Sequence, residues 1–221
     1  MRFTWILVLS LVFSGVATPG LAKLIDELGQ PTKVIDESGL KISIFPEVAP
    51  HASGLPAGVS KLFLTGAGVR QRRVALFNVN VYVVASYVDH TFQLPTESPM
   101  SGISQSKVNA LQLTFLRDIS GDLIRKAFIQ SLSRNGADPK SPGLSKILDQ
   151  LDMPMPKGSH LILLGFASKA GSETLFFETP NGKTLTTEGP GVATQFWKIW
   201  FGEPADSGLE KLRTELVGGR S

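Results

Sequence analysis

The sequence contains no cysteine and only three histidines among its 221 residues. Without cysteine the chain can form no disulfide, no thiolate metal site and no lipid anchor on an N-terminal cysteine. The histidines, His51, His90 and His160, lie far apart, and none is paired with a carboxylate at a spacing that metal ligands use. We therefore expect no metal site.

Motifs for nucleotide binding and acyl transfer are also missing. The chain has neither a G-x-S-x-G nucleophile motif nor a Walker loop. The stretch "GAGVR" at residues 66–70 resembles part of a phosphate loop, but it continues into an alternating strand pattern. A phosphate loop needs a helix N-terminus at that point, so we expect no nucleotide and no other cofactor.

A strong excess of one charge is absent as well. Lys and Arg number 22 against 19 Asp and Glu, which gives a net charge of +3. This excess is too small for the electrostatic footprint of a nucleic-acid-binding protein. The one dense basic cluster, Arg70, Arg72 and Arg73, is typical of a solvated turn, and we expect no nucleic-acid partner.

The first 22 residues have the pattern of a secretory signal peptide. A positive start at Arg2 precedes the apolar residues 3–16, and small residues follow, with Gly20 and Ala22 at the spacing that a signal peptidase reads. A retained anchor or a buried helix is the alternative, but the apolar run is shorter than the roughly 20 residues of a membrane span. We expect an exported protein, periplasmic where the source has an outer membrane, without a later membrane-spanning segment.

The rest of the chain alternates between strand and helix patterns. Residues 23–57 predict an irregular lead-in with one strand that begins at Leu40 and is stopped by Pro46, and residues 58–218 predict one domain without a long linker. The predicted strands are 60–70, 74–88, 108–116, 160–167, 173–179 and 183–188, and the predicted helices are 120–133, 144–151, 192–201 and 207–217. Strand 60–70 is expected to run into a glycine turn, and Gly66 and Gly68 are typical of a place where the backbone bends or approaches another group closely. Asn181 and Gly182 predict a tight hairpin between the last two strands. Together these elements predict an α+β fold, an antiparallel sheet with helices on one face.

The long strand at 74–88 carries a polar row on one face. Alternation places Asn78, Asn80, Tyr82 and Ser86 on that face, with a bend or bulge expected near residues 78–80 because about fifteen residues is long for a strand. Such a row between apolar side chains is typical of a small-molecule pocket. The alternative is that Arg70 lies in water and Tyr82 is an ordinary core residue.

Arg70 and Tyr82 together suggest the ligand. A guanidinium can hold a carboxylate or enolate oxygen by two charged hydrogen bonds, and a phenol can add a neutral one. The ligand implied is a small amphipathic acid.

Several segments resemble the chalcone isomerase family, in particular its bacterial exported members. These are "GAGVR", "VYVVASYV", "LQLTFLRDISGDLIRKAFIQSL", "KGSHLILL", "TPNGK" and "GVATQFWKIWFGEPADSGLEKL", in the family's order across residues 58–218. The resemblance implies an antiparallel sheet backed by helices, which agrees with the predicted element order.

The resemblance also implies roles for two residues. Arg70 matches the arginine that acts on the oxygen chemistry of ring closure in the plant enzymes, whereas Tyr82 stands where they carry a threonine. The tyrosine and asparagine that those enzymes use near the next helix have no match in residues 118–130. The family's fatty-acid-binding branch holds a carboxylate with an arginine and a strand tyrosine, which implies that role for Arg70 and Tyr82.

Three functions follow as hypotheses. The leading one is an exported, non-catalytic protein that binds a fatty acid or a similar amphipathic acid, with Arg70, Tyr82, Asn80 and Ser86 as ligand-binding residues and no catalytic residues. The second is an isomerase, an intramolecular lyase of the chalcone isomerase type. The third is an envelope protein that binds a protein partner and keeps a vestigial pocket. The sequence leaves the oligomeric state open.

Overall fold

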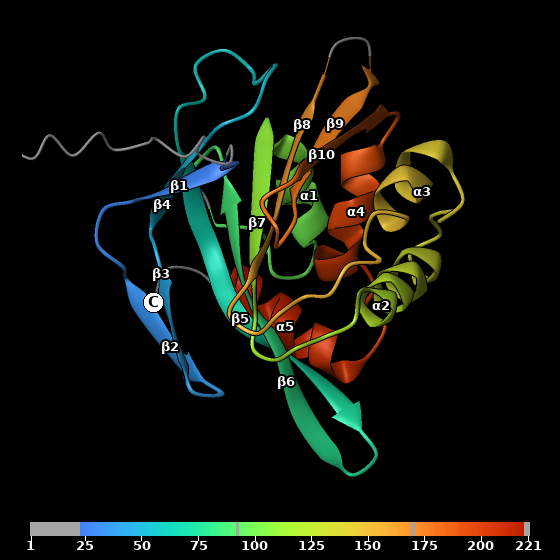
Figure 1. Ribbon diagram of the computed structural model, residues 1–221. Coiled ribbons are helices and arrows are strands. Elements are labelled where there is room, and N and C mark those ends of the chain that lie inside the picture. Colours follow the sequence, from blue (N-terminus) through green and yellow to red (C-terminus); the bar gives the residue numbers. More distant parts are fainter. Residues whose placement is uncertain (1–22, 92, 169–170, 219–221) are drawn as a thin grey trace, which may run out of the picture.

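The computed structural model describes residues 23–91, 93–168 and 171–218 of the chain (Figure 1). The predicted signal peptide at residues 1–22 lies outside the described residues. No helix of the described part is long and apolar enough to cross a membrane.

One antiparallel sheet of eight strands forms the centre of the molecule, in the order β1-β4-β5-β6-β7-β8-β9-β10. Its strands are β1 Ile25–Leu28, β4 Glu47–Pro50, β5 Leu62–Val74, β6 Phe77–Val88, β7 Val108–Phe115, β8 His160–Ala167, β9 Glu173–Glu178 and β10 Thr184–Gly189. From β4 onward the strands that pair in space are also consecutive in sequence, apart from the helices between them. Such a meander needs only hairpins and short helical connections.

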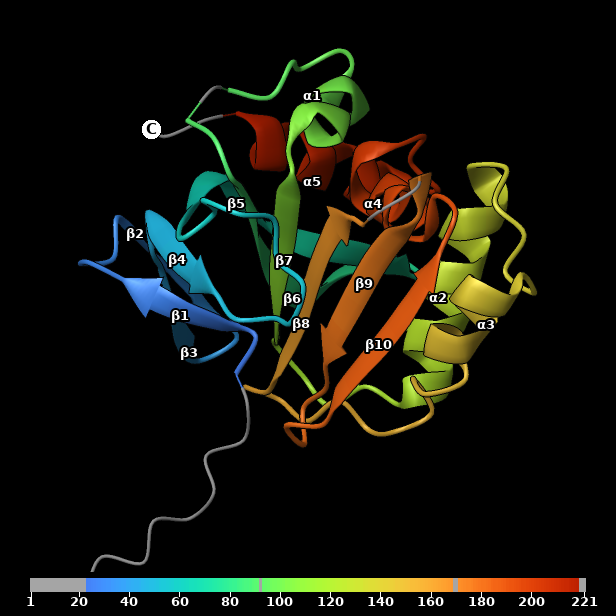
Figure 2. The ribbon, with the colours of Figure 1, turned by 90° about the horizontal axis from the view of Figure 1, so that it is seen from above.

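The two faces of the sheet are covered by different structures (Figure 2). All the helices of the described chain lie on one side, and a separate hairpin of β2 and β3 lies on the other. The helices are α1 Pro99–Gln105, α2 Gly121–Arg134, α3 Pro142–Leu148, α4 Val192–Phe201 and α5 Ser207–Val217, and the hairpin strands are β2 Lys33–Glu37 and β3 Leu40–Ile44. A hydrophobic core lies on each face. The predicted α+β class, with helices on one face, is confirmed.

Local sequence signals located most of these elements correctly. Helices α4 and α5 have the bounds that the sequence predicts, and α2 follows Ser120 as expected. In α4, Phe196, Trp197 and Trp200 are all buried against the sheet, because aromatic residues at helical spacing form one face. The β9–β10 hairpin turns at Gly182, which adopts a φ of 76°.

Two local predictions were wrong. The lead-in contains four strands where one was expected, since β1 and β4 extend the main sheet and β2 pairs with β3. The glycine turn is absent as well, because β5 continues through Gly66 and Gly68, with a register shift between Leu64 and Gly66, to a turn at Ala75. The other expectation for these glycines, a close approach of another group, agrees with the structure, since a Cβ on Gly68 would lie 2.7 Å from the Cβ of Glu215 in α5.

Candidate functional site

A pocket of about 690 Å³ opens between the end of the sheet and the helices. It is bounded by the end of β5 and the start of β6, by most of the length of α2, and by the start of α5. Its volume lies within the range of roughly 300 to 1,000 Å³ that is usual for small-molecule sites. The lining includes two of the predicted ligand residues, Arg70 and Tyr82.

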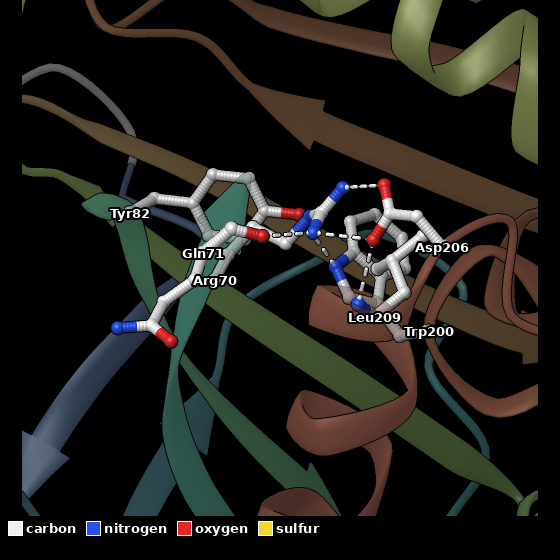
Figure 3. A network of polar contacts seen from close by, with 6 residues as sticks. All are labelled: Arg70, Gln71, Tyr82, Trp200, Asp206 and Leu209. Carbon is white, nitrogen blue, oxygen red and sulfur yellow. Dashed lines mark hydrogen bonds and ion pairs between the residues drawn. The ribbon is translucent and has the colours of Figure 1, made fainter. Parts of the chain in front are cut away.

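Arg70 is held inside this pocket rather than in water. It pairs with Tyr82 across β5 and β6, and only 7% of its surface is exposed. Its Nη1 and Nη2 atoms donate to the two carboxylate oxygens of Asp206, at 2.8 and 2.6 Å, and Nη1 also donates to the carbonyl oxygen of Gln71 (Figure 3). The guanidinium is therefore already engaged by a carboxylate through two charged hydrogen bonds.

Asp206 has a second role, as the N-cap of α5. Its Oδ1 accepts a hydrogen bond of 3.0 Å from the backbone N–H of Leu209. Burial alone would raise the pKa of Asp206, but the hydrogen bonds from Arg70 and the helix backbone lower that pKa below its usual value. The first turn of α5 can come this close because a Cβ on Gly208 would collide with Gln71 and Arg70.

Tyr82 is buried at the same end of the pocket, with its hydroxyl facing α4. This hydroxyl accepts a hydrogen bond of 3.1 Å from Nε1 of Trp200. Burial raises the pKa of Tyr82 above its usual value, although the nearby Arg70 charge and the Trp200 hydrogen bond act in the opposite direction. The phenol therefore keeps its proton, and among the described residues no acceptor takes it, so Tyr82 can donate to a ligand.

Asn80 does not share a face with Tyr82, so its predicted place in the polar row was wrong. Arg70 pairs with Tyr82 but Gln71 pairs with Asn80, so Val81 is an extra residue in β6, a β-bulge close to the expected position. The bulge shifts the alternation by one residue. Asn80 consequently accepts from Gln71 and donates to Glu37 in the hairpin on the opposite face, at 2.9 and 2.6 Å.

Ser86 lies on the helix face, but away from the pocket. It is almost fully buried, pairs with Gly66 and Leu111, and is not a lining residue. Four residues of extended chain separate it from Tyr82, which is a distance of about 13 Å. The structure thus brings Arg70 and Tyr82 together and leaves both Asn80 and Ser86 outside the site.

The walls of the pocket are apolar and its rim is basic. On α2 the wall is formed by Leu123, Ile124, Ala127 and Phe128, and on the preceding loop by Ile119. At the rim lie Arg72, Arg73 and Arg117, none of which forms an ion pair with a described residue.

Potential metal-ligating side chains are scattered in the described part of the chain. No group of three or more His, Cys, Asp or Glu side chains comes together there. The pocket can instead hold an apolar body and recognise one polar head group through Arg70 and Tyr82.

Sequence reasoning missed two members of this site, Asp206 and Trp200. Asp206 precedes a correctly predicted helix, which marks it as a cap, but only the fold brings that cap to Arg70. Trp200 is buried in the core, where its N–H group needs a partner, and this need is a signal that could have pointed to Tyr82.

The structure is that of an α+β protein with a pocket of small-molecule size between its sheet and its helices. The sequence matches the chalcone isomerase-like family over residues 50–218, and the chain belongs to that family. The expected family is therefore confirmed.

One solved structure with the same fold is a fatty-acid binding protein of Arabidopsis thaliana. The TM-score is 0.51 at 16% sequence identity, and the match covers 84% of this chain and 96% of the plant protein. Among curated proteins no sequence matches this chain.

Proposed function

We propose that this protein binds a fatty acid or a similar amphipathic carboxylate, without catalysing a reaction on it. The observation that carries the proposal is the combination, in one pocket of about 690 Å³, of an apolar wall and a buried Arg70 beside Tyr82. The structural neighbour, a fatty-acid binding protein, has the same fold and supports a ligand of this class.

The ligand's head group would lie at the inner end of the pocket. There its carboxylate would take hydrogen bonds from Arg70 and from the protonated phenol of Tyr82, while its chain runs along the apolar side of α2. Because Asp206 already occupies Arg70, the ligand must displace this carboxylate or share the guanidinium with it. The affinity for the ligand therefore depends on how well its carboxylate competes with that of Asp206 for the Arg70 guanidinium.

Arg70→Ala tests this proposal directly. Protein recovered from cells is denatured and its released lipids are identified by mass spectrometry, and the affinity for a fluorescent fatty acid is then measured. Losing a charged hydrogen bond of about 1.5 to 3 kcal/mol should weaken binding by roughly ten- to a hundredfold. Arg125→Ala, which removes a half-buried arginine that is paired with Asp149 and does not line the pocket, is the control. Equal affinity in the wild type and Arg70→Ala would refute the head-group assignment.

A catalytic role of the chalcone isomerase type is the competing function, because the family and the Arg70–Tyr82 pair are both present. The α2 wall argues against it, since the groups it offers the pocket are mainly aliphatic and aromatic. Loss of the long-wavelength absorbance of an added chalcone, at a rate that falls in Arg70→Ala, would establish catalysis instead.

Export to the periplasm belongs to the same proposal and rests on the signal-peptide pattern of residues 1–22. Mass spectrometry of the purified protein tests it, with a mature N-terminus after Ala22 as the expected result. An envelope protein with a vestigial pocket would show neither bound lipid nor an effect of Arg70→Ala.

A further inference from the structure

The hairpin of β5 and β6 extends beyond the rest of the sheet and ends in an exposed apolar tip. Figure 1 shows the two strands projecting past the helices, with their turn free of neighbours on either side. At this turn, Val74, Leu76 and Phe77 are 55%, 82% and 74% exposed. Large apolar side chains grouped in this way on a soluble domain mark a site of interaction.

Cations surround this tip. Arg72 and Arg73 directly precede it on β5, and Arg117 lies with them at the rim of the same pocket. Apart from the Arg70–Asp206 pair, the only acid among the described residues that line the pocket is Asp118. The tip therefore combines apolar side chains that can enter an apolar phase with cations behind them that form no ion pair with a described residue.

We propose that this hairpin tip docks on the surface of an anionic phospholipid bilayer. Leu76 and Phe77 would enter the boundary between head groups and acyl chains, while Arg72 and Arg73 bind lipid phosphates. The charge arrangement favours a bilayer over a protein partner or a second copy of the chain. When the apolar tip reaches the acyl chains of a bilayer, the arginines behind the tip lie at the level of the anionic head groups.

The docking surface adjoins the pocket mouth. Arg72, Arg73 and Val74 line the pocket as well as the stem of the hairpin, and Leu123, 52% exposed at the start of α2, lies at the same opening. A docked protein would thus turn its pocket toward the bilayer. Transfer of a fatty acid between membrane and pocket rests on the proposed function, whereas docking itself does not.

Vesicle binding tests the docking surface. The purified protein is mixed with vesicles of phosphatidylcholine, with or without phosphatidylglycerol, and floated on a density gradient. We expect binding to the anionic vesicles only, with a loss of binding at high salt. Each basic residue at an anionic surface is worth about fivefold in affinity, so Arg72→Ser/Arg73→Ser should weaken binding roughly thirtyfold.

The apolar part is tested with Leu76→Ser/Phe77→Ser, for which we expect a loss of at least about tenfold. Both side chains are exposed, so the fold should tolerate the change. Val34→Ser is the matched control, because Val34 is equally apolar, 55% exposed, and lies on β2 away from the tip. All variants share the same N-terminus, so any contribution of residues 1–22 is common to them.

Depth of insertion gives a second, independent measurement. Phe77→Trp should be quenched by phospholipids brominated on their acyl chains, beyond the quenching of the wild type. Absence of extra quenching, or equal vesicle binding by wild type and Leu76→Ser/Phe77→Ser, would overturn the proposal. Self-association that the tip substitutions abolish, without vesicle binding, would assign the tip to a second copy of the chain instead.

The fatty-acid affinity of each variant separates the two proposals. If vesicle binding depends on the tip but no fatty acid binds, the function proposed for the pocket fails while docking stands. If Arg70→Ala abolishes fatty-acid binding but the tip substitutions leave vesicle binding unchanged, only docking fails.

Discussion

Replacing Asp206 with Asn is expected to strengthen fatty-acid binding and to destabilise the empty protein. In the wild type, both oxygens of the Asp206 carboxylate accept from the Arg70 guanidinium, at 2.8 and 2.6 Å. An asparagine at this position keeps an oxygen that can cap α5 through the N–H of Leu209, but it has no charge to compete with a ligand carboxylate. Arg70 would then be a buried cation that lacks an ionic partner until the ligand arrives.

The magnitude follows from the exposure of the two partners. The Arg70 side chain is 9% exposed, but that of Asp206 is 43% exposed, so solvent screens the pair. A hydrogen bond to a charged group contributes about 1.5 to 3 kcal/mol, and screening favours the lower end of this range. The expected gain in carboxylate affinity is therefore about tenfold.

Two measurements check this expectation. Isothermal calorimetry should show the gain for a fatty acid but none for the fatty alcohol of equal chain length, which carries no charge. The thermal midpoint of Asp206→Asn without ligand should fall below that of the wild type, and added fatty acid should raise it by more than in the wild type. Glu203→Gln is the control, since Glu203 forms an ion pair with Arg134 on the exposed surface. Unchanged or weaker fatty-acid affinity in Asp206→Asn would refute competition for Arg70.

The Arg70–Asp206 ion pair predicts that the stability of the protein depends on pH. The pKa of Asp206 is lowered in the folded protein from an ordinary value of 3.8, so the native state favours the ionised form. The contribution of ionised Asp206 to the free energy of unfolding is complete above the ordinary pKa, and it is lost as the pH falls through the lower pKa of the folded protein. The difference in free energy of unfolding between wild type and Asp206→Asn should thus be constant at neutral pH and shrink in acid. A difference that grows in acid would contradict this sign.

Two further substitutions test the packing around the site. Tyr82→Phe removes the acceptor of the buried Trp200 N–H, so we expect a loss of stability of about 1 to 3 kcal/mol in urea unfolding, together with weaker fatty-acid binding; a fully stable variant would mean that Trp200 finds another acceptor. Gly68→Ala would place a Cβ 2.7 Å from that of Glu215 and should lower the thermal midpoint by pushing α5 off β5, whereas Gly189→Ala, with nothing within 4 Å, should not. Equal midpoints for the two alanine variants would refute the close approach of α5.

Much of the fold could be predicted because its signals are local. Caps, helical periodicity and the Asn181–Gly182 turn depend on neighbours in sequence, and the elements that they predict, α2, α4, α5 and the β9–β10 hairpin, are present. Strands β1, β2 and β4 were missed because their sequences, IDEL, KVIDE and EVAP, do not alternate between apolar and polar residues, whereas the LKISI of β3 does. The sequence left two roles open for Gly66 and Gly68, because a glycine required for close packing looks the same in sequence as one required for bending.

The site divides in the same way between sequence and tertiary structure. The sequence by itself identified Arg70 and Tyr82 as candidate ligand-binding residues, and the structure places both at one pocket. Only the tertiary structure decided their surroundings. One extra residue at Val81 turned Asn80 to the other face, and the start of α5, far along the chain, brought Asp206 to Arg70. A bulge depends on how two strands pair, and an ion pair between distant residues depends on how elements pack. Neither feature can be recognised from the periodicity of the sequence.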